Sequence, residues 1–426
     1  MMTLIKGGRV IDPGKLNGIM DIFIADGKIV EIKTEGLADG EYPELKTIDA
    51  SGKIVIPGLI DMHVHLREPG YEHKETIKTG CRSAVVGGFT GVCCMPNTNP
   101  VNDCKGVTEY ILAKAREAGT ARVYPVAAIS KGSRGEDLCD YGELKSAGAV
   151  ALSDDGNPVM NSQLMRRALE QAREWQLPVI SHCEDLHLAA DGVMNEGAVA
   201  RDMGLPGIPN ASESIMVLRD IALSELTGAS VHIAHVSTLE SVRAIREAKT
   251  RNVAVTAETA PHYFTLTDAF VKGYNTNMKM NPPLRSIHDR EAVRQGLADG
   301  TIDVIATDHA PHSSIEKSVE FQKAPNGIIG LETALSLGLN LVDDGILTLD
   351  GLIEKMSTNP ARILGLKNGL IVGQPADISI VDLGRSYRVN ADRFKSLSRN
   401  TPFDGWDMKG KTVLTMVGGK IVYHEE

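Results

Sequence analysis

Residues 54–67 read IVIPGLIDMHVHLR, an apolar, β-prone run that ends by alternating histidine with apolar residues. Side chains two positions apart lie on one face of an extended strand. His63, His65 and Arg67 can therefore converge on one point while Val64 and Leu66 pack elsewhere. Two imidazoles suit a zinc-like ion, and the neighbouring guanidinium suits an anionic substrate. Taken alone, the two histidines could equally be core residues whose ring nitrogens bond to backbone groups.

Length and composition limit the class of protein. At 426 residues the chain suits a barrel of roughly 250 residues with an added smaller domain. A net charge of -10 gives little reason to expect nucleic acid or an anionic membrane surface as a partner. The N-terminus has no signal-peptide core, no apolar run approaches the roughly 18 residues of a membrane span, and six cysteines in so long a chain make no disulfide framework. We expect a cytoplasmic protein with reduced thiols.

Both ends of the chain carry short strand-like runs. Residues 21–30 read DIFIADGKIV, a hairpin pattern with Asp-Gly at its turn, and residues 377–382 and 418–423 repeat the strand pattern. We therefore expect one small β-sandwich domain built from both termini, residues 1–55 and 366–426.

The middle of the chain, residues 56–365, alternates short apolar strands with amphipathic segments such as 161–176 and 238–249. This alternation is typical of a parallel α/β sheet. Eight strands are expected, and they end near His65, Asn97, Ala128, Asp155, His182, His235, Glu258 and Asp308. Eight βα units predict a closed (β/α)8 TIM-type barrel, whose active site lies at the C-terminal strand ends. The metal-competent residues of this chain fall at those ends.

Three further strand ends carry metal-competent side chains. His182 ends one buried strand, His235 another, and Asp308 follows the last. His232, three residues before His235, faces the opposite side of its strand and is expected to be structural. Any one of these segments alone would more often be structural, but four in series on one barrel favour a metal site.

Four histidines exceed what one catalytic ion with an open position needs. Two ions are the simpler interpretation, and they need an anionic bridge between them. The fourth strand offers Asp154 and Asp155. Adjacent strand residues face opposite ways, so only one should point inward while the other caps the following turn. The residues alone leave this choice open.

Several longer segments resemble the motifs of one enzyme family. Residues 57–70, PGLIDMHVHLREPG, are similar to the opening signature of dihydroorotases, which belong to the amidohydrolase superfamily. MPNTNP at 95–100 and ATDHAPH at 306–312 resemble the second and last motifs, and GLET at 330–333 and MNPPLR at 280–285 also match. The resemblance runs through the whole barrel, and the terminal segments resemble the superfamily's small sheet domain. His-x-His marks only the superfamily, whereas Arg67 with Met-Pro-Asn-Thr is more specific to dihydroorotases.

The resemblance implies a site for two zinc ions, although the same ligand types accept other divalent ions. Many relatives bridge the two metals with a carboxylated lysine at the fourth strand, but Lys145 lies before that strand, at the wrong end of the barrel. The pair Asp154-Asp155 instead resembles the dihydroorotase type with an aspartate bridge, which implies Asp155 as the bridging ligand. The implied ligands are His63, His65 and Asp308 for one ion and His182 and His235 for the other.

The activity implied by the resemblance is the reversible cyclisation of N-carbamoyl-L-aspartate to dihydroorotate, in de novo pyrimidine biosynthesis. Asp308 would shuttle the proton between the nucleophile and the departing ring nitrogen. Arg67 is the natural partner of the substrate carboxylate, because a guanidinium fork matches two oxygens. The residues expected to bind this small-molecule substrate are His65, Arg67, Asn97, Asn281, His312, Asn326 and Gly327. Residues 309–317, polar and strand-free, are a candidate lid.

Two other functions stay open at this point. Another cyclic amidase, such as a dihydropyrimidinase, hydantoinase or allantoinase, shares the metal pair, but its substrate lacks the carboxylate that Arg67 and Asn97 would bind. A non-catalytic relative typically loses metal ligands, whereas this chain keeps all six candidate ligands. The resemblance also implies a homodimer and, as in some relatives, association with aspartate carbamoyltransferase, although no segment of the sequence demonstrates either.

Overall fold

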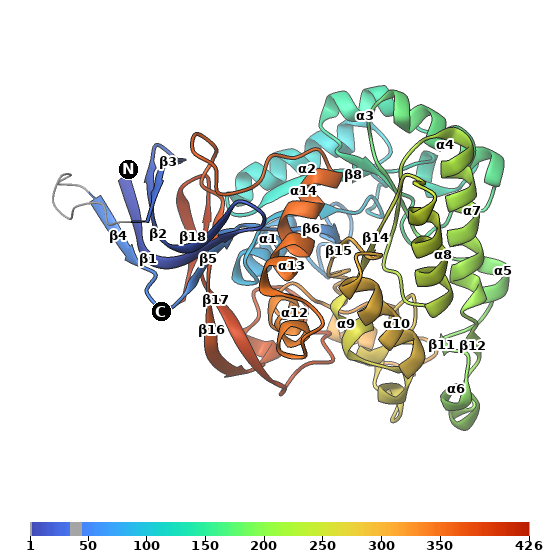
Figure 1. The fold of residues 1–426 in the computed structure, drawn as a ribbon. Helices are drawn as coiled ribbons and strands as arrows, with labels where there is room; N and C mark the ends of the chain where they lie inside the picture. Colours follow the sequence, from blue (N-terminus) through green and yellow to red (C-terminus); the bar gives the residue numbers. More distant parts are fainter. Residues whose placement is uncertain (1, 35–44, 426) are drawn as a thin grey trace.

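The computed structural model describes residues 2–34 and 45–425, and two eight-stranded sheets dominate it (Figure 1). The sheet from the middle of the chain is parallel throughout and runs in the order β15-β14-β13-β10-β9-β8-β7-β6. Its strands are β6 (Leu59–Val64), β7 (Phe89–Cys94), β8 (Arg122–Ala127), β9 (Ala151–Leu152), β10 (Val179–Ser181), β13 (Val231–Ile233), β14 (Val255–Thr259) and β15 (Val304–Ile305).

The two edges of this sheet meet. Val64, at the end of β6, forms a parallel bridge with His309, which lies just past β15. The backbone N–H of His65 donates to the carbonyl of His309 at 2.8 Å. The sheet therefore closes on itself, and the predicted (β/α)8 barrel is confirmed.

Helices cover the outside of the barrel (Figure 1). They are α1 (Ile77–Val86), α2 (Lys105–Ala118), α3 (Tyr141–Ala147), α4 (Ser162–Glu174), α7 (Ala211–Thr227), α8 (Leu239–Thr250), α10 (Ile287–Ala298) and α12 (Ala334–Asp343). Helix α4 shows why they form: the Asn161 side chain accepts from two N–H groups of the first turn, and one apolar stripe is buried. Helix α8 begins after Thr238, whose side chain accepts from Ser241 N. Both helices lie where the amphipathic pattern predicted them.

Shorter elements lie in the connections between the barrel strands and in the segment that follows β15. They are α5 (Leu186–Ala189), β11 (Met194–Asn195), α6 (Ala198–Met203), β12 (Gly207–Ile208), α9 (Pro261–Thr265), α11 (Ser314–Lys317), α13 (Leu349–Ile353) and α14 (Asn359–Ile363). Inside the barrel, apolar side chains such as Ile60, Met62, Val126 and Ile180 form a separate buried cluster. The barrel is thus a packed core whose chemistry is confined to its mouth.

The second sheet joins both termini in the order β18-β17-β16-β5-β1-β2-β3, with β4 paired to β1 (Figure 1). Its strands are β1 (Met2–Asp12), β2 (Leu16–Ala25), β3 (Lys28–Lys33), β4 (Leu45–Asp49), β5 (Ile54–Pro57), β16 (Ile378–Arg388), β17 (Asp407–Val417) and β18 (Lys420–His424). Its apolar cluster combines residues of both termini, including Ile22, Val55, Ile378 and Leu414. This separate sheet fits the predicted small β-sandwich domain.

The expected hairpin around Asp26-Gly27 is also present. Strands β2 and β3 pair antiparallel, and φ is +50° at Asp26 and +80° at Gly27. Positive φ at both central residues is what a type I′ turn requires, which is why Asp-Gly is favoured there.

The division of the chain at residues 55 and 366 stays a prediction. Residue 55 falls inside β5, which pairs with both β1 and β16, and residues 35–44 of the expected small domain lie outside the described residues. None of the described helices is both long and apolar enough to cross a membrane.

Candidate metal centre and substrate cavity

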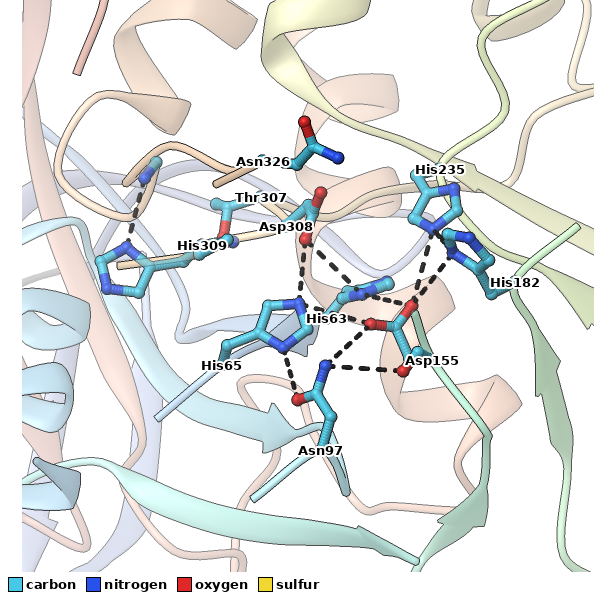
Figure 2. Close-up of polar contacts among 12 residues, drawn as sticks. His63, His65, Asn97, Asp155, His182, His235, Thr307, Asp308, His309 and Asn326 are labelled. Atoms are coloured by element: carbon cyan, nitrogen blue, oxygen red, sulfur yellow. Dashed lines mark hydrogen bonds and ion pairs between the residues drawn. The ribbon is translucent and has the colours of Figure 1, made fainter. Parts of the chain in front are cut away.

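The six side chains predicted as metal ligands come together at the mouth of the barrel (Figure 2). His63 lies in β6 and His65 directly follows it. The other four follow their strands within three residues: Asp155 after β9, His182 after β10, His235 after β13 and Asp308 after β15. Parallel strands end at the same side of a barrel, so residues far apart in the sequence meet there.

Three residues of this region have backbone angles that side-chain-bearing residues rarely adopt. The φ angle is +62° at Arg67, +34° at His235 and +49° at Asp308. Such conformations cost on the order of 1–3 kcal/mol each and persist only where the surroundings over-determine them. Their concentration at one barrel mouth is typical of a functional site.

Asp155 is the centre of the cluster. Its Oδ1 lies 3.3 Å from His63 Nε2, 3.5 Å from His182 Nδ1 and 3.6 Å from His235 Nε2. Its Oδ2 lies 3.5 Å from His65 Nε2. Burial would raise the pKa of Asp155, but the charge on His63 and the hydrogen bonds from the histidines hold this pKa well below its ordinary value. Both oxygens of one ionised carboxylate thus face imidazole nitrogens from opposite sides.

The donor atoms fit divalent metal ions. Two groupings could each hold one, His63 with His65 and Asp155, and Asp155 with His182 and His235, and within each grouping the donor atoms lie within 4.8 Å of one another. His63 Nε2 and Asp155 Oδ1 are buried and find no hydrogen-bond partner among residues 2–34 and 45–425. Buried polar atoms without a partner lower the stability of the folded protein, and an ion bound between these two atoms would remove that loss. Asp155 belongs to both groupings, as a bridge must.

Asp154 points the other way. Its Oδ1 accepts from the backbone N–H groups of Ile129 at 2.8 Å and Ser130 at 3.1 Å, and its Oδ2 accepts from the Ser130 hydroxyl. Burial raises the pKa of Asp154 to about 6. The two aspartates therefore face opposite sides, as the alternation predicted, and Asp155 is the one that faces the histidines. Asp154 therefore stabilises the loop after β8 and, contrary to expectation, does not cap the turn that follows Asp155.

Three histidines use their second ring nitrogen to contact another side chain. His63 Nδ1 lies 2.6 Å from Glu258 Oε1, His65 Nδ1 lies 2.9 Å from Asn97 Oδ1, and His182 Nε2 lies 3.1 Å from Glu184 Oε2. A carboxylate or amide oxygen can only accept, so each of these nitrogens carries the proton. The other nitrogen of each ring points toward Asp155 and can coordinate a metal once it gives up its proton.

The sequence analysis missed the roles of Glu258 and Glu184. Glu258 had been noted only as a strand end, but the structure shows it buried between His63 Nδ1 and His232 Nε2. Charges on these histidines outweigh the effect of burial and lower the pKa of Glu258. His232 is structural, as expected. For Glu184 a signal existed, because residues 182 and 184 share one face of an extended segment.

A cavity of about 230 Å³ opens onto this cluster. Its wall contains every predicted site residue except His63, which lies fully buried beneath it. The lining residues are His65, Arg67, Asn97, Asp155, Gly156, His182, His235, Asn281, Asp308, Ala310, His312, Asn326 and Gly327. A larger cavity of about 580 Å³ lies against β16 and contains none of them.

The part of the cavity wall around Arg67 and His312 is cationic and rich in hydrogen-bond groups. Arg67 Nε donates to the carbonyl of Pro311 at 3.2 Å, and its Nη2 lies 3.4 Å from His312 Nε2. His312 Nε2 is 2.8 Å from the carbonyl of Asn326, so this nitrogen carries the proton. Burial, together with the charges of Arg67 and nearby lysines, lowers the pKa of His312 to about 3. The wall therefore presents one guanidinium beside a neutral imidazole.

Asp308 joins the metal cluster to this wall. Its Oδ1 lies 3.1 Å from His65 Nε2 and 3.6 Å from His63 Nε2. Burial would raise the pKa of Asp308, but the hydrogen bond with His65 and the charges of the histidines lower it overall. Asp308 is thus an ionised carboxylate on the surface of the cavity.

The candidate lid is anchored in this structure. Residues 309–317 include the short helix α11, and His309, Ala310 and His312 are buried. Lys317 Nζ donates to the carbonyls of Pro325 at 2.9 Å and Lys279 at 3.3 Å. The segment forms part of the cavity wall, and its closing over substrate stays a prediction.

Comparison with known proteins agrees with this geometry. Residues 52–241 match a family model described as Dihydro-orotase-like. The chain is 56% identical to a dihydroorotase of Syntrophus aciditrophicus over 429 residues, covering 100% of both chains. It is 58% identical to a dihydroorotase of Desulforapulum autotrophicum over 426 residues, again covering 100% of both. The chain belongs to the dihydroorotase family.

Solved structures of other cyclic amidases share the fold of this dihydroorotase family member. L-hydantoinase from Arthrobacter aurescens superposes with a TM-score of 0.86 at 26% identity, covering 99% of this chain and 96% of that one. Dihydropyrimidinase from Brevibacillus agri gives a TM-score of 0.84 at 23% identity, covering 100% and 95%. These enzymes are more distant than the dihydroorotases. Dihydroorotases depend on metal, and the two groupings around Asp155 are the candidate sites in this chain.

Proposed function

We propose that this protein is a dihydroorotase, which interconverts N-carbamoyl-L-aspartate and (S)-dihydroorotate plus water in de novo pyrimidine biosynthesis. The observation that carries the proposal is one cavity whose wall holds both Asp155 with its histidines and Arg67. A cyclic amide needs activation of its carbonyl, and a substrate carboxylate needs a cation. Both requirements are met within about 230 Å³.

The cofactor we propose is a pair of divalent ions, most simply zinc. His63, His65 and Asp308 would hold one ion, His182 and His235 the other, and Asp155 would bridge them. When bound, such ions polarise a carbonyl and lower the pKa of a bound water to about 7. The contacts of the second ring nitrogens of His63, His65 and His182 support this assignment, because they hold the other nitrogen of each ring toward Asp155.

Asp308 is the proposed proton carrier. In the hydrolytic direction its carboxylate accepts a proton from the attacking water and gives it to the ring nitrogen that leaves. In the biosynthetic direction the same carboxylate takes the proton from the carbamoyl nitrogen. Its lowered pKa keeps it ready to accept a proton, and its place on the cavity surface brings it within reach of substrate.

Arg67 is the proposed partner of the substrate carboxylate. Residues of the same wall would complete the contact: Asn97, His312, and the backbone groups of Asn326 and Gly327, with Asn281 on the amide edge of the ring and His65 beside it. His312 supports this binding as a neutral donor and acceptor, because its pKa is lowered to about 3. Arg67 therefore supplies the formal charge, while its neighbours supply hydrogen bonds.

The test is to replace Arg67 by Met and to compare two substrates. The variant leaves a carboxylate unpaired in a partly buried site, at a cost of roughly 2–5 kcal/mol. We expect kcat/KM for dihydroorotate to fall about 30- to 5000-fold, and that for dihydrouracil, which lacks the carboxylate, to change little. Metal content should stay as in the unaltered protein.

The control is Arg122→Met. It removes a guanidinium that pairs with Asp377, away from the cavity, and should leave both activities intact. Equal losses on both substrates in Arg67→Met would assign Arg67 to the fold or the metal site. Turnover of dihydrouracil but not of dihydroorotate by the unaltered protein would favour the dihydropyrimidinase reaction instead.

Three points stay predictions: a homodimer and association with aspartate carbamoyltransferase, which the resemblance implies, and the cytoplasmic location expected from the sequence. Sedimentation of the purified chain, alone and mixed with aspartate carbamoyltransferase, would check the first two. Fractionation of the source cells would check the third.

A further inference from the structure

A segment from the C-terminal part of the chain reaches the mouth of the barrel. Residues 396–400 lie between β16 and β17, two strands of the terminal sheet. Ser396, Ser398 and Asn400 are nonetheless buried, at 2%, 3% and 4% exposure. Their partners belong to barrel loops rather than to the terminal sheet. This part of the chain is therefore part of the surroundings of the cavity.

Asn400 uses its whole side-chain amide to join two segments of the cavity wall. Its Nδ2 donates to the carbonyls of Ala310 and Gly327, each at 3.1 Å. Its Oδ1 accepts from the backbone N–H of His312 at 3.1 Å. Two carbonyls require the donor end and one N–H requires the acceptor end, so the orientation of the amide is fixed. All three partner residues line the cavity.

The two segments that Asn400 joins approach each other closely. Gly327 has a φ of +126°, and a Cβ at this position would lie 2.6 Å from the Cβ of Ala310. The bond from His312 Nε2 to the carbonyl of Asn326 crosses the same gap at 2.8 Å. A backbone hydrogen bond from Ala310 N to the carbonyl of Ile328 at 2.7 Å also joins them, so the Asn400 amide is one of several contacts that set their spacing.

The rest of the 396–400 segment is held by bonds that do not touch the cavity. Ser398 Oγ donates to the carbonyl of Lys74 at 2.6 Å. Glu75 accepts from the Ser396 hydroxyl and, at 3.0 Å, from the backbone N–H of Leu397. These bonds remain when the Asn400 side chain is removed. A change at Asn400 can therefore act on the wall without releasing the segment.

We propose that Asn400 is a positioning residue that holds the carboxylate-binding wall, residues 310–312 and 326–327, in register for substrate. The proposal rests on the proposed function, because that function assigns this wall to the substrate carboxylate. Asn400 acts through His312, Asn326 and Gly327 and does not itself line the cavity. The part of the chain that builds the terminal sheet thereby contributes to substrate selection.

The experiment compares Asn400→Ala and Asn400→Asp with two controls. Asn400→Ala leaves two buried carbonyls and one N–H unpaired, so we expect KM for dihydroorotate to rise about 5- to 150-fold with kcat reduced less. Asn400→Asp keeps the shape of the side chain and the acceptor for His312 N, and serves where Asn400→Ala does not fold. The new carboxylate oxygen would face the two carbonyl oxygens that the amide now donates to, and it would repel them. We therefore expect KM to rise at least as much in Asn400→Asp as in Asn400→Ala. Bound zinc, measured by metal analysis, should match the unaltered protein in both variants.

The controls separate positioning from stability. Ser398→Ala removes a buried bond of the same segment, and Asn368→Ala removes an amide that bonds Gly58 O and Ser357 Oγ away from the cavity. We expect both to lower the melting temperature with KM within about twofold of the unaltered value. The proposal is overturned if Asn400→Ala leaves KM unchanged, or if it lowers kcat for dihydroorotate and dihydrouracil alike. An unaltered protein without activity on dihydroorotate would instead refute the proposed function itself.

Discussion

The two halves of the candidate metal centre differ in what supports them from behind. Behind His63, on β6, lies Glu258, a buried carboxylate that also contacts the structural residue His232. Behind His182, after β10, lies Glu184, whose Oε2 also accepts from Asn281 Nδ2 at 2.9 Å. Asn281 lines the cavity, whereas neither Glu258 nor His232 does. His63 is therefore held by the barrel interior, whereas His182 is linked to the substrate side through Glu184 and Asn281.

The backbone supports the same distinction. Asp61, one of the most buried residues of β6, accepts from the backbone N–H groups of His63 at 3.0 Å and Thr307 at 3.2 Å. Burial raises the pKa of Asp61 to about 7. This side chain ties β6 to the segment that carries Asp308, at the seam where the barrel closes. The half around His63 is thus rigid before any ligand arrives, which is what a fixed metal position requires.

The largest expected effect is on the carboxylate that both halves share. Asp155→Ala removes the only anionic side chain common to the two groupings, so metal analysis should show at least one of about two ions lost per chain. Activity on dihydroorotate should fall more than about 100-fold, since even changes outside the ligands cost 10- to 100-fold. Asp154→Ala is the matched control. It should lower thermal stability and keep the metal, because Asp154 bonds to Ser130 and to the backbone of Ile129 and belongs to neither metal grouping. Loss of metal from Asp154→Ala, but not from Asp155→Ala, would reverse the choice of bridge.

The sequence predicted the parts of this site that depend on local pattern. His63 and His65 share a strand face by simple alternation, and the histidines and aspartate of later strands meet because parallel strands end at one rim. The fold class followed from the same alternation of strands and helices. The Asp154–Asp155 choice did not follow, because alternation predicts that the two side chains face opposite ways but not which of them faces the histidines.

What the sequence could not predict depends on contacts between distant segments. Glu258 contacts His63 from another strand, 195 positions away in the sequence. No motif near either residue indicates this contact. Asn400 belongs to a stretch between two strands of the terminal sheet, so its position in the sequence gives no sign of its contacts with the cavity wall. From the sequence alone, His312 could be a charged residue of the cavity. The structure shows that burial and the charge of Arg67 lower its pKa, so it is neutral. Each of these roles is set by packing rather than by composition.

The next effect tests whether the first half is fixed by Glu258. Glu258→Gln keeps the shape and one acceptor oxygen but removes the negative charge opposite His63 Nδ1. We expect metal affinity at the His63 side to weaken about 10- to 100-fold in a chelator competition, with KM for dihydroorotate unchanged when metal is in excess. Glu75→Gln is the control, because Glu75 makes an equally buried contact with His309, which no metal grouping includes. Equal metal loss in both variants would mean that general loss of buried charge, and not support of His63, is responsible.

The smallest effect tests the link between the second half and the substrate. Glu184 Oε2 bonds both His182 and Asn281, so replacing either partner should alter the role of the other. In a double-mutant cycle with Glu184→Gln and Asn281→Ala, we expect the losses in kcat/KM to be non-additive by about two- to tenfold, the worth of one hydrogen bond. The matched cycle pairs Glu258→Gln with Asn281→Ala, which share no partner, and should be additive within about twofold. Additivity in both cycles would break the comparison, because His182 would then be as independent of the substrate wall as His63. Coupling in the Glu184 cycle alone would mean that binding at the amide edge of the substrate and the orientation of His182 are set by one carboxylate.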